Sequence, residues 1–227
     1  MITAGTRLVA LIGHPVTHSL SPRMQTAAFA ARGLDWAYVA LDVRPEHLEE
    51  AIRGLAALGF AGANVTTPHK LAVGELVHAD EPSVNTLLVE DGRIEGRSTD
   101  TAVLEGLTAE RPVILGGGGA ARSFQDALPH ARVFSRRGDW PPDAADADLV
   151  VNATSERDDV LVELRQGQTL VDLPYPDTAT AAAAQAAGAT VVTGLEVLVA
   201  QGAASFELWT GVPAPVSVMR TAVGLPG

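Results

Sequence analysis

The sequence predicts an α/β fold built from two domains, and three observations lead to this prediction. Short apolar runs alternate with helical patterns along the chain, an order that is typical of α/β proteins. A glycine-rich stretch, GGGGAA at residues 116–121, follows an apolar run and opens a helical pattern, as in a dinucleotide-binding turn. A second series of strand patterns begins near residue 101, so we expect an α/β domain over residues 1–100 and a compact domain of the Rossmann type over 101–193.

The first domain is expected to open with a strand and a helix. TRLVALIGHP, residues 6–15, is an apolar run that ends in a glycine-containing loop, which predicts a strand. The helix that follows is predicted over SPRMQTAAFAARG, with Ser21 as its N-cap, Pro22 as its first helical residue and Gly33 beyond its end.

Two further strands, two helices and a hairpin are expected to complete the first domain. WAYVALDV (36–43) and FAGANV (60–65) are apolar runs that predict strands, with a helix between them and another after the second. The signals that start, end or turn these elements are Pro45, Gly59, Pro68 and the hairpin pair Asp91-Gly92.

The second domain is expected to begin with a strand, the glycine turn and a helix over residues 111–128. Further apolar runs predict strands, an alanine-rich tract predicts a helix, and two more helices end the chain. The strands are predicted in 131–137, 147–155 and 168–176, a helix and a strand in 178–194, and the last helices in 195–211 and 214–224.

Composition and charge narrow the class of protein. The chain has 227 residues, is 47% apolar and carries a formal charge of −11. Such a surface repels polyphosphate and anionic lipid, so we expect neither a nucleic acid nor a membrane as a partner. The sequence has no cysteine, no metal site is expected, and its start lacks the features of a signal peptide. These features predict a soluble, cytoplasmic protein with a small-molecule substrate.

The glycine turn matches the pattern G-x-G-x-x-G/A through Gly116, Gly118 and Ala121. The first glycine permits a tight turn, the second lets a pyrophosphate approach the backbone, and the third small residue lets helix and strand pack closely. The next strand ends in SRR, residues 135–137, where an NAD site usually has a carboxylate. Guanidinium groups suit a 2′-phosphate, so the pattern favours NADP; the alternative is a pair of solvated surface arginines.

Lys70, in the stretch NVTTPHK, is the only lysine in the chain. Lysine, unlike arginine, can lose its proton where its surroundings favour the neutral amine. Lys70 is therefore either an ordinary surface residue or the one amine that the protein uses to handle a proton. Its neighbour His69 is expected to be exposed.

Eight motifs in order along the chain resemble the shikimate dehydrogenase family. They cover almost the whole chain, and their order makes the resemblance specific. The motifs are GHPVTHSLSPRM (13–24), GANVTTPHK (62–70), VNTL (84–87), STD (98–100), LGGGGAAR (115–122), VVNATS (150–155), VDLPY (171–175) and GLEVLVAQGAASFELWTG (194–211).

The resemblance implies a role for each matching residue around the substrate. Lys70 and Asp100 would form the catalytic pair, in which Lys70 supplies a proton to the developing alkoxide. The substrate-binding residues implied are Ser19 and Ser21 for the carboxylate, Thr66, Asn85 and Gln201 for the ring hydroxyls, and Tyr175 near the carboxylate and the nicotinamide.

The resemblance also implies NADP as the cofactor and a set of residues that hold it. These cofactor-binding residues are Gly116, Gly117, Gly118, Gly119, Ala120, Ala121, Ser135, Arg136, Arg137, Thr154 and Gly194. The helices over 194–227 would pack back on the first domain, which would bind the substrate.

The chain departs from the family pattern in three places. Ser98 stands where the family has Asn, and the stretch HADEPS before VNT is abbreviated. Only residues 138–148 separate SRR from the next strand, where the family usually has a helix and a further strand. The cofactor domain is therefore expected to be trimmed.

The function that this resemblance implies is NADP-dependent, reversible reduction of 3-dehydroshikimate to shikimate, in aromatic amino-acid biosynthesis. One alternative is a dehydrogenase of the same family that acts on quinate or another polyol acid with NAD or NADP. Another is a non-catalytic sensor of a ligand or of NADP on the same fold, although a sensor has no need of both Lys70 and Asp100. We expect a monomer or a homodimer.

Overall fold

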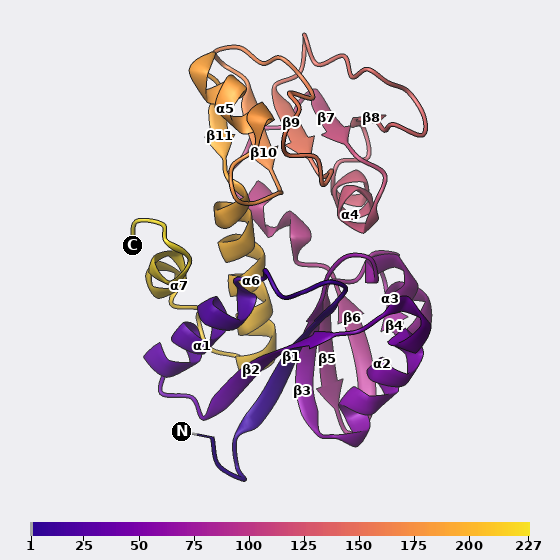
Figure 1. Cartoon of the computed structure of the whole chain (residues 1–227), viewed down its shortest axis with the longest axis vertical. Helices are drawn as coiled ribbons and strands as arrows, with labels where there is room; N and C mark the ends of the chain where they lie inside the picture. The colour runs from indigo at the N-terminus through magenta and orange to yellow at the C-terminus, as the bar shows by residue number, and fades with distance from the viewer. Residues whose placement is uncertain (1) are drawn as a thin grey trace. The chain divides into compact units, whose positions relative to one another are not determined.

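The computed structural model describes residues 2–227 and divides into two compact units. Unit 1 comprises the chain up to Thr99 together with Val199–Gly227, and unit 2 comprises Asp100–Leu198. Each unit has its own β-sheet with helices on both faces (Figure 1). The α/β fold class predicted from the sequence is confirmed.

The sheet of unit 1 is mixed, with six strands in the order β2-β1-β3-β5-β6-β4. β2, β1 and β3 run parallel, and β5 pairs antiparallel with both β3 and β6. The strands are β1 Arg7–Gly13, β2 Trp36–Asp42, β3 Phe60–Val65, β4 His78–Ala79, β5 Thr86–Glu90 and β6 Arg93–Arg97.

Helices cover both faces of this sheet (Figure 1). On one face, α2 and α3 pack over a core that contains Ile12, Ile52 and Val73. On the other face lie α1, α7 and the C-terminal part of α6, where the rings of Phe29 and Phe206 stack at 5.4 Å. The helices are α1 Ser21–Ala31, α2 Leu48–Ala57 after the 3-10 turn η1 Pro45–His47, α3 Lys70–Leu76, α6 Gly194–Thr210 and α7 Val216–Val223.

Unit 2 has a five-stranded parallel sheet in the order β11-β10-β9-β7-β8. Because β8 lies on one side of β7 and β9 on the other, the strand order reverses at β7, and ligands of such sheets bind at the carboxyl ends of the strands at this point. The elements are η2 Asp100–Leu104, β7 Pro112–Leu115, α4 Gly119–Ala127, β8 Arg132–Phe134, β9 Leu149–Asn152, β10 Thr169–Asp172, α5 Ala179–Ala186 and β11 Thr190–Val192.

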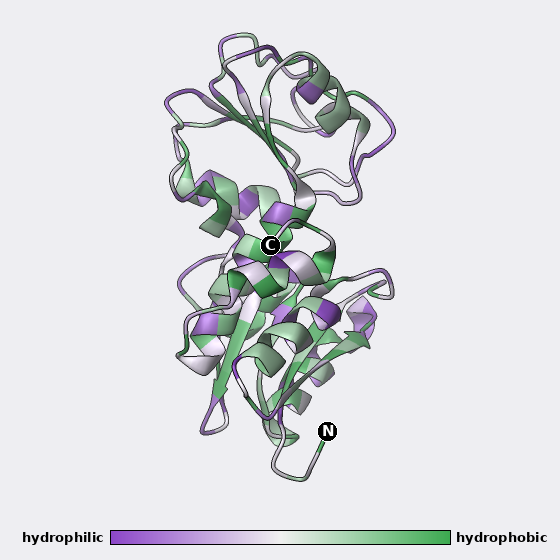
Figure 2. Cartoon of the chain, turned by 90° about the vertical axis from the view of Figure 1, so that its left-hand side faces the viewer, coloured by the Kyte–Doolittle hydropathy of each residue, from purple (hydrophilic) through white to green (hydrophobic). Residues whose placement is uncertain are grey.

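The two faces of this sheet are covered in different ways. α4 and η2 pack over one face around Phe124 and Val151. The other face carries α5 and, where a doubly wound sheet usually has further helices, irregular segments that contribute Ala144, Leu161 and Leu164. Residues 135–148, between β8 and β9, contain no helix or strand, so the unit has the trimmed connection expected from the sequence. Figure 2 shows that the strands at the centre of each unit are predominantly hydrophobic.

The start of α1 differs from the sequence prediction. Leu20, and not Ser21, occupies the N-cap position, and no side chain caps the helix. The carbonyl of Leu20 accepts the first helical hydrogen bond, from the N–H of Met24 at 3.0 Å. The preceding turn, from Val16 to Ser19, ends directly before Leu20, so the helix begins one residue earlier than predicted. Pro22 is consequently the second helical residue, while Gly33 ends the helix at a φ of +66° as predicted.

Two short elements were not predicted, and the prediction also left out the local signal T-x-x-E (193–196) that starts one helix. β4 and η2 lie in stretches too short for a periodic pattern. α6 begins with a capping box, in which Thr193 Oγ1 accepts from the Glu196 N–H at 3.4 Å while the Glu196 carboxylate accepts from the Thr193 N–H at 2.8 Å. The hairpin turn at Asp91 and Gly92 has φ values of 49° and 76°, as its sequence predicted.

Candidate active site

In unit 1, the loops that follow β1 and β3 are joined at the carboxyl edge of the sheet. The His14 N–H donates to the Thr67 carbonyl at 3.1 Å, and the Thr66 N–H donates to the Ile12 carbonyl at 2.9 Å. A Cβ on Gly13 would lie 2.3 Å from Thr66 Cγ2, so only glycine permits this approach. The loop that contains Ser19 and the loop that contains Thr66 therefore leave the sheet side by side.

Ser19 and Ser21, the predicted carboxylate ligands, are close to each other at the start of α1. The Ser19 hydroxyl accepts from the Ser21 N–H at 3.2 Å. The side chain of Ser21 is buried, and within residues 2–227 its hydroxyl forms no hydrogen bond. That hydroxyl is consequently available to a ligand at the N-terminus of α1, where the helix dipole favours an anion.

Lys70 is the first residue of α3, where β3 and the TTPH loop place it. His69, directly before it, is only 1% exposed, and its Nε2 lies 2.7 Å from the Val43 carbonyl. The expectation that His69 is exposed is therefore wrong: its ring is packed beneath the loop and ties that loop to the end of β2. His69 fixes the backbone at Lys70, whose carbonyl accepts from the Val84 N–H at 3.0 Å.

Asn85 is 2% exposed and its amide has a defined orientation. Its Oδ1 accepts from the Thr99 N–H at 2.7 Å and from the Thr86 hydroxyl at 3.0 Å. Because a backbone N–H can only donate, oxygen must face Thr99, and Nδ2 then lies 3.5 Å from Gln201 Oε1. Asn85 and Gln201, predicted to bind ring hydroxyls, are thus neighbours in unit 1.

A buried polar network supports this pair, and sequence reasoning missed it. Asn64 Nδ2 donates to the Ser205 hydroxyl at 2.9 Å, and Ser205 lies 2.8 Å from Thr86 Oγ1. The Tyr38 hydroxyl donates to Asn64 Oδ1 at 2.8 Å and closes the network at the far end. Asn64 stands in an otherwise apolar strand, FAGANV, which is the one signal in the sequence that could have indicated it.

Asp100 opens unit 2 at the start of η2 and is 6% exposed. The hydroxyl of Ser123, on α4, donates to Asp100 Oδ2 at 3.4 Å. η2 packs against α4, so this carboxylate is held on the helix that follows the glycine turn. Lys70 belongs to unit 1, and each member of the predicted catalytic pair is therefore positioned by its own unit.

The glycine turn lies at the carboxyl end of β7, between the ends of β8 and β9. The Gly116 N–H donates to the Phe134 carbonyl and the Ala153 N–H to the Leu115 carbonyl, both at 2.8 Å. Gly116 has a φ of +128°, and a Cβ there would lie 2.9 Å from the Ala153 carbonyl oxygen. A Cβ on Gly118, in contrast, would meet no atom within 4 Å, so nothing in the protein requires a glycine there. The open space at Gly118, directly before the N-terminus of α4, fits the close approach of a pyrophosphate.

The remaining residues of the turn play simpler parts. Ala121, in the first turn of α4, is fully buried in the core that also contains Ile114 of β7 and Val151 of β9, which is the close helix–strand contact that the motif predicts. Gly119 and Ala120 begin α4, and a Cβ on Gly117 would lie 3.6 Å from the Cβ of Ser135, an ordinary contact.

Thr154, a predicted cofactor residue, is oriented by a buried Asn–Asp pair at the ends of β9 and β10. Asn152 Oδ1 accepts from the Thr154 hydroxyl at 2.8 Å and from its N–H at 3.1 Å, while Asn152 Nδ2 donates to Asp172 Oδ1 at 2.7 Å. The Thr178 hydroxyl donates to Asp172 Oδ2 at 2.7 Å. Burial raises the pKa of Asp172, although the hydrogen bonds from Thr178 and Asn152 act in the opposite direction.

The predicted 2′-phosphate residues follow β8, and the structure separates their environments. Arg136 Nη2 lies 3.1 Å from Glu156 Oε2 and 3.7 Å from Asp159 Oδ2, both in the loop after β9. Arg137 is exposed and forms no side-chain hydrogen bond or ion pair within residues 2–227. The sequence predicted two guanidinium groups available to a phosphate, whereas Arg136 already has two carboxylate partners.

Tyr175 lies shortly after β10 and Gly194 shortly after β11. Tyr175 is half-buried in the loop after β10. Gly194 begins α6, and a Cβ there would lie 2.1 Å from the Pro174 carbonyl oxygen. Glycine at this position is therefore required by the contact between α6 and the loop that carries Tyr175.

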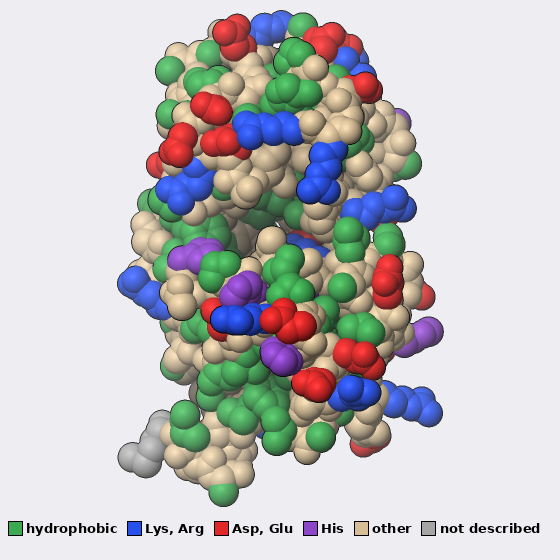
Figure 3. Space-filling model, turned by 45° about the vertical axis from the view of Figure 1, so that its right-hand side comes forward, with side chains coloured by type: hydrophobic (Ala, Val, Ile, Leu, Met, Phe, Trp, Pro, Cys, Tyr) green, Lys and Arg blue, Asp and Glu red, His purple; other side chains and the backbone are tan. Residues whose placement is uncertain are grey.

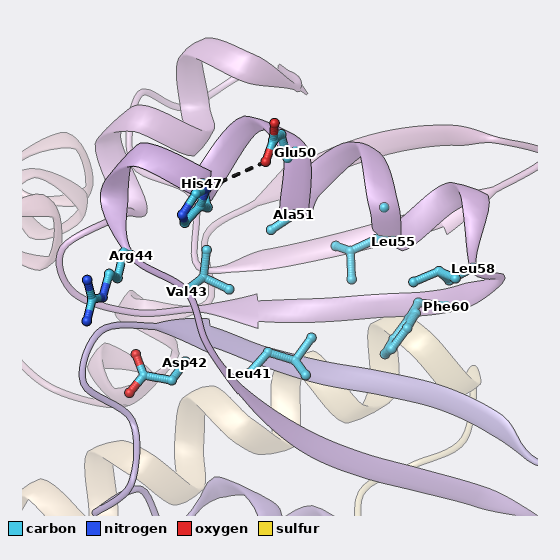
Figure 4. Close-up of a pocket in the computed structure, with 11 residues that line it drawn as sticks. Leu41, Asp42, Val43, Arg44, His47, Glu50, Ala51, Leu55, Leu58 and Phe60 are labelled. Carbon is cyan, nitrogen blue, oxygen red and sulfur yellow. Dashed lines mark ion pairs between the residues drawn. The ribbon is translucent and has the colours of Figure 1, made fainter.

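A shallow groove of about 590 Å³ lies elsewhere in unit 1, between α2 and the ends of β2 and β3 (Figure 4). Its floor is apolar, with Leu41, Leu55 and Phe60, and His47 pairs with Glu50 at 3.5 Å on its rim. None of the predicted site residues lines it. Within residues 2–227 there is no cluster of three or more His, Asp or Glu side chains that could hold a metal ion, and no helix long and apolar enough to cross a membrane.

Comparison with known proteins gives matches along the whole chain. Residues 11–87 match the family model described as the shikimate dehydrogenase substrate binding domain, and residues 194–223 match the one described as the shikimate 5′-dehydrogenase C-terminal domain. The shikimate dehydrogenase (NADP(+)) of Anaeromyxobacter sp. (strain Fw109-5) is 41% identical over 276 residues, covering 100% of this chain and 99% of the relative. That aligned length exceeds the 227 residues of this chain, so the relative has segments that this chain lacks.

Solved structures agree with these matches. The shikimate 5-dehydrogenase of Thermus thermophilus, solved in complex with NADP(H) and shikimate, has a TM-score of 0.85 at 31% identity and covers 96% of this chain, with 98% of its own chain covered. The quinate dehydrogenase of Corynebacterium glutamicum, in complex with NAD, has a TM-score of 0.79 at 25% identity, with 96% and 98% covered.

Proposed function

This chain belongs to the shikimate dehydrogenase family, and we propose from this premise that it catalyses the NADP-linked, reversible reduction of 3-dehydroshikimate to shikimate. The observation that carries the proposal is the 41% identity to a shikimate dehydrogenase (NADP(+)) over the whole chain. Curated relatives that are 36–41% identical to this chain are named shikimate dehydrogenase (NADP(+)), which favours shikimate over quinate as the substrate.

Unit 2 is proposed to hold NADP at the carboxyl edge of its sheet. The space at Gly118 and the N-terminus of α4 suit the pyrophosphate. Thr154 donates its hydroxyl proton to Asn152, and its oxygen, beside the turn, can accept a hydrogen bond from the cofactor. Ser135, Arg136 and Arg137 would hold the 2′-phosphate, and Gly194 would let α6 begin close to the bound cofactor. When bound, the nicotinamide supplies and accepts the hydride.

Unit 1 is proposed to bind the substrate. The Ser21 hydroxyl and the N-terminus of α1 suit a carboxylate, with Ser19 beside them. The Asn85 amide, whose orientation is fixed by Thr99, would donate to a ring hydroxyl, and Gln201 and Thr66 would contact the others. Tyr175 is proposed as a further ligand of the carboxylate.

Lys70 and Asp100 are proposed as the catalytic pair. Reduction of the ring ketone places negative charge on its oxygen, and that oxygen needs a proton. The Lys70 ammonium would stabilise the charge and donate the proton, and in the reverse direction the amine would accept it. Asp100, held by Ser123, would keep the amine oriented.

The setting that best suits this reaction is the cytoplasm, with the protein as a monomer or homodimer. Its formal charge of −11 disfavours nucleic acid and anionic membranes as partners. The reaction needs a small-molecule substrate and cofactor alone.

The test follows absorbance at 340 nm with purified protein, shikimate and NADP, and then with NAD or quinate in place of one of them. Rapid NADP reduction by shikimate is expected, with quinate and NAD slower.

Lys70→Met removes the amine and keeps most of the side-chain volume, so kcat is expected to fall by about 10²–10⁴-fold, the range for loss of a general acid. Arg53→Met, which removes an exposed cation of unit 1, is the matched control and is expected to leave kcat unchanged.

The same measurements separate the alternatives. Faster turnover with quinate would assign the chain to the polyol-acid dehydrogenases of the family. Binding of NADP by the wild type without turnover of any substrate would support the sensor and contradict the enzyme.

A further inference from the structure

Two loops flank the glycine turn of unit 2, and an ion pair joins them. In the sheet, β8 and β9 are the two neighbours of β7, so the loops after β8 and after β9 lie on opposite sides of the turn after β7. Arg136 comes from the first loop, and Glu156 and Asp159 come from the second. Their contacts, at 3.1 and 3.7 Å, therefore connect one flank of the proposed cofactor site to the other.

Glu156 is a fixed anion rather than a mobile surface side chain. Its Oε1 accepts from the backbone N–H groups of Arg157 at 3.0 Å and Asp158 at 3.1 Å, which leaves Oε2 for Arg136. The N–H of Glu156 in turn donates to the Thr154 hydroxyl at 3.2 Å. The backbone hydrogen bonds from Asp158 and Arg157 lower the pKa of Glu156, so the carboxylate is ionised at neutral pH.

Arg136 is held from a second side as well. Its guanidinium carbon lies 5.9 Å from the centre of the Trp140 ring, and Trp140 packs against the core of unit 2. Arg137 has no comparable partner within residues 2–227. Figure 3 shows that acidic and basic side chains are interspersed on the face of unit 2 that it displays.

We propose that Glu156, with Asp159 in support, sets the cofactor preference of this enzyme by competing with the 2′-phosphate of NADP for Arg136. The inference rests on the proposed function, in which Arg136 binds that phosphate. A 2′-phosphate must displace or share the guanidinium and sit beside a fixed carboxylate, and both requirements oppose its binding. NAD has no such phosphate and is not affected, so the competition reduces the difference in affinity between NADP and NAD. Glu156 is thus a specificity-determining residue that acts through Arg136.

The experiment compares two nucleotide fragments that differ only in the 2′-phosphate, adenosine 2′,5′-bisphosphate and AMP. Their dissociation constants are measured by calorimetry at low ionic strength for the full-length wild type, Glu156→Gln and Asp159→Asn. Glutamine keeps an oxygen for the two backbone N–H groups, so the loop retains its anchor. Glu163→Gln, which removes an exposed carboxylate of unit 2 that has no partner within residues 2–227, controls for net charge.

Glu156→Gln is expected to lower the dissociation constant of the bisphosphate by about three- to fivefold, the upper range for loss of an exposed ion pair. The dissociation constant of AMP is expected to be unchanged. Asp159→Asn is expected to act in the same direction and more weakly, because its contact is longer. In an Arg136→Met background, the gain from Glu156→Gln is expected to become smaller, because only the direct repulsion between the carboxylate and the phosphate is then relieved. A structural effect on the loop would instead move both fragments together.

Each result has one reading. The inference is overturned, and the cofactor proposal stands, if Arg136→Met weakens binding of the bisphosphate while Glu156→Gln weakens it or leaves it unchanged. If Arg136→Met leaves the bisphosphate unchanged, the assignment of the 2′-phosphate site fails and the inference fails with it. A gain equal to that of Glu163→Gln would reduce the effect to net charge and would also overturn it.

Discussion

The side-chain oxygen of Asn85 accepts a hydrogen bond from the backbone N–H of Thr99 at 2.7 Å. This bond decides which end of the Asn85 amide faces Gln201, since a backbone N–H has no alternative to donation. Thr99 immediately precedes Asp100 in the chain. One hydrogen bond thus fixes the amide of a proposed substrate ligand and holds the backbone next to a proposed catalytic residue.

Replacement of Asn85 by aspartate tests this orientation. Aspartate keeps an oxygen for Thr99 but cannot donate, and it places a buried carboxylate beside Gln201 Oε1. We expect the KM for shikimate to rise and the free energy of unfolding to fall by about 1–3 kcal/mol, as for a buried polar group left unsatisfied. NADP affinity, measured by fluorescence, is expected to be unchanged, and Gln185→Glu at an exposed amide is the control. An unchanged KM would argue against Asn85 as a substrate ligand.

The glycine turn makes opposite predictions for two of its residues. Gly118→Ala adds a methyl group where no protein atom lies within 4 Å, so thermal stability should not change. The methyl group would occupy the approach of the pyrophosphate, and we expect NADP to bind about tenfold more weakly, equivalent to roughly 1.4 kcal/mol. Full affinity for NADP in Gly118→Ala would contradict the placement of the pyrophosphate.

Gly116→Ala is expected to affect stability first. The residue has a φ of +128° and its added Cβ would lie 2.9 Å from a backbone oxygen that cannot move aside easily. The expected loss is about 2 kcal/mol or more in free energy of unfolding, measured by urea denaturation. Stability equal to that of the wild type would show that the turn relaxes without cost.

Asp172 predicts a pH dependence of stability with a defined sign. Its pKa is raised above the ordinary value of 3.8, chiefly by burial, so the folded state holds the proton more tightly than the unfolded state. The contribution of Asp172 to stability is therefore greatest below pH 3.8 and is lost as pH rises through the folded-state pKa. The free energy of unfolding of the wild type minus that of Asp172→Asn should decrease as pH rises from about 4 to 7, by at most about 1.4 kcal/mol per pH unit. A difference that grows over this range would mean that the pKa is lowered.

Gly62 and Gly54 form a matched pair for packing in unit 1. A Cβ on Gly62 would lie 2.3 Å from the Leu87 carbonyl oxygen and 2.5 Å from Trp209 Nε1, atoms that are already hydrogen-bonded to each other at 2.9 Å. Gly62→Ala should therefore destabilise the protein by about 1–3 kcal/mol. Gly54, inside α2, has open space around it, and Gly54→Ala should stabilise by about 0.5–1 kcal/mol. Equal effects in chemical denaturation would contradict this difference.

The elements that the sequence predicted well are those with a strong local pattern. β1, β3 and β7 are continuous apolar runs, and the Asp91-Gly92 turn has the residues that its backbone angles require. Where the pattern was short or the decisive contact was distant, prediction was wrong or silent. The N-cap of α1 was placed at Ser21 because serine is a good cap, yet the preceding turn put Leu20 there. His69 was expected to be exposed, yet its ring bonds to Val43, 26 residues away in sequence.

The α/β class, the glycine turn and the residue types that a dehydrogenase of this family needs can all be predicted from the sequence. Those properties follow from the periodicity of apolar residues, from the backbone freedom of glycine and from the order of the motifs along the chain. The partners of those residues depend on the folded chain: Arg136 pairs with Glu156, Asn85 with Thr99, and Asn152 with Asp172. Each of these pairs joins residues that are 14–20 positions apart, and it is the order of the strands within each sheet, which no local pattern encodes, that brings them within hydrogen-bond distance.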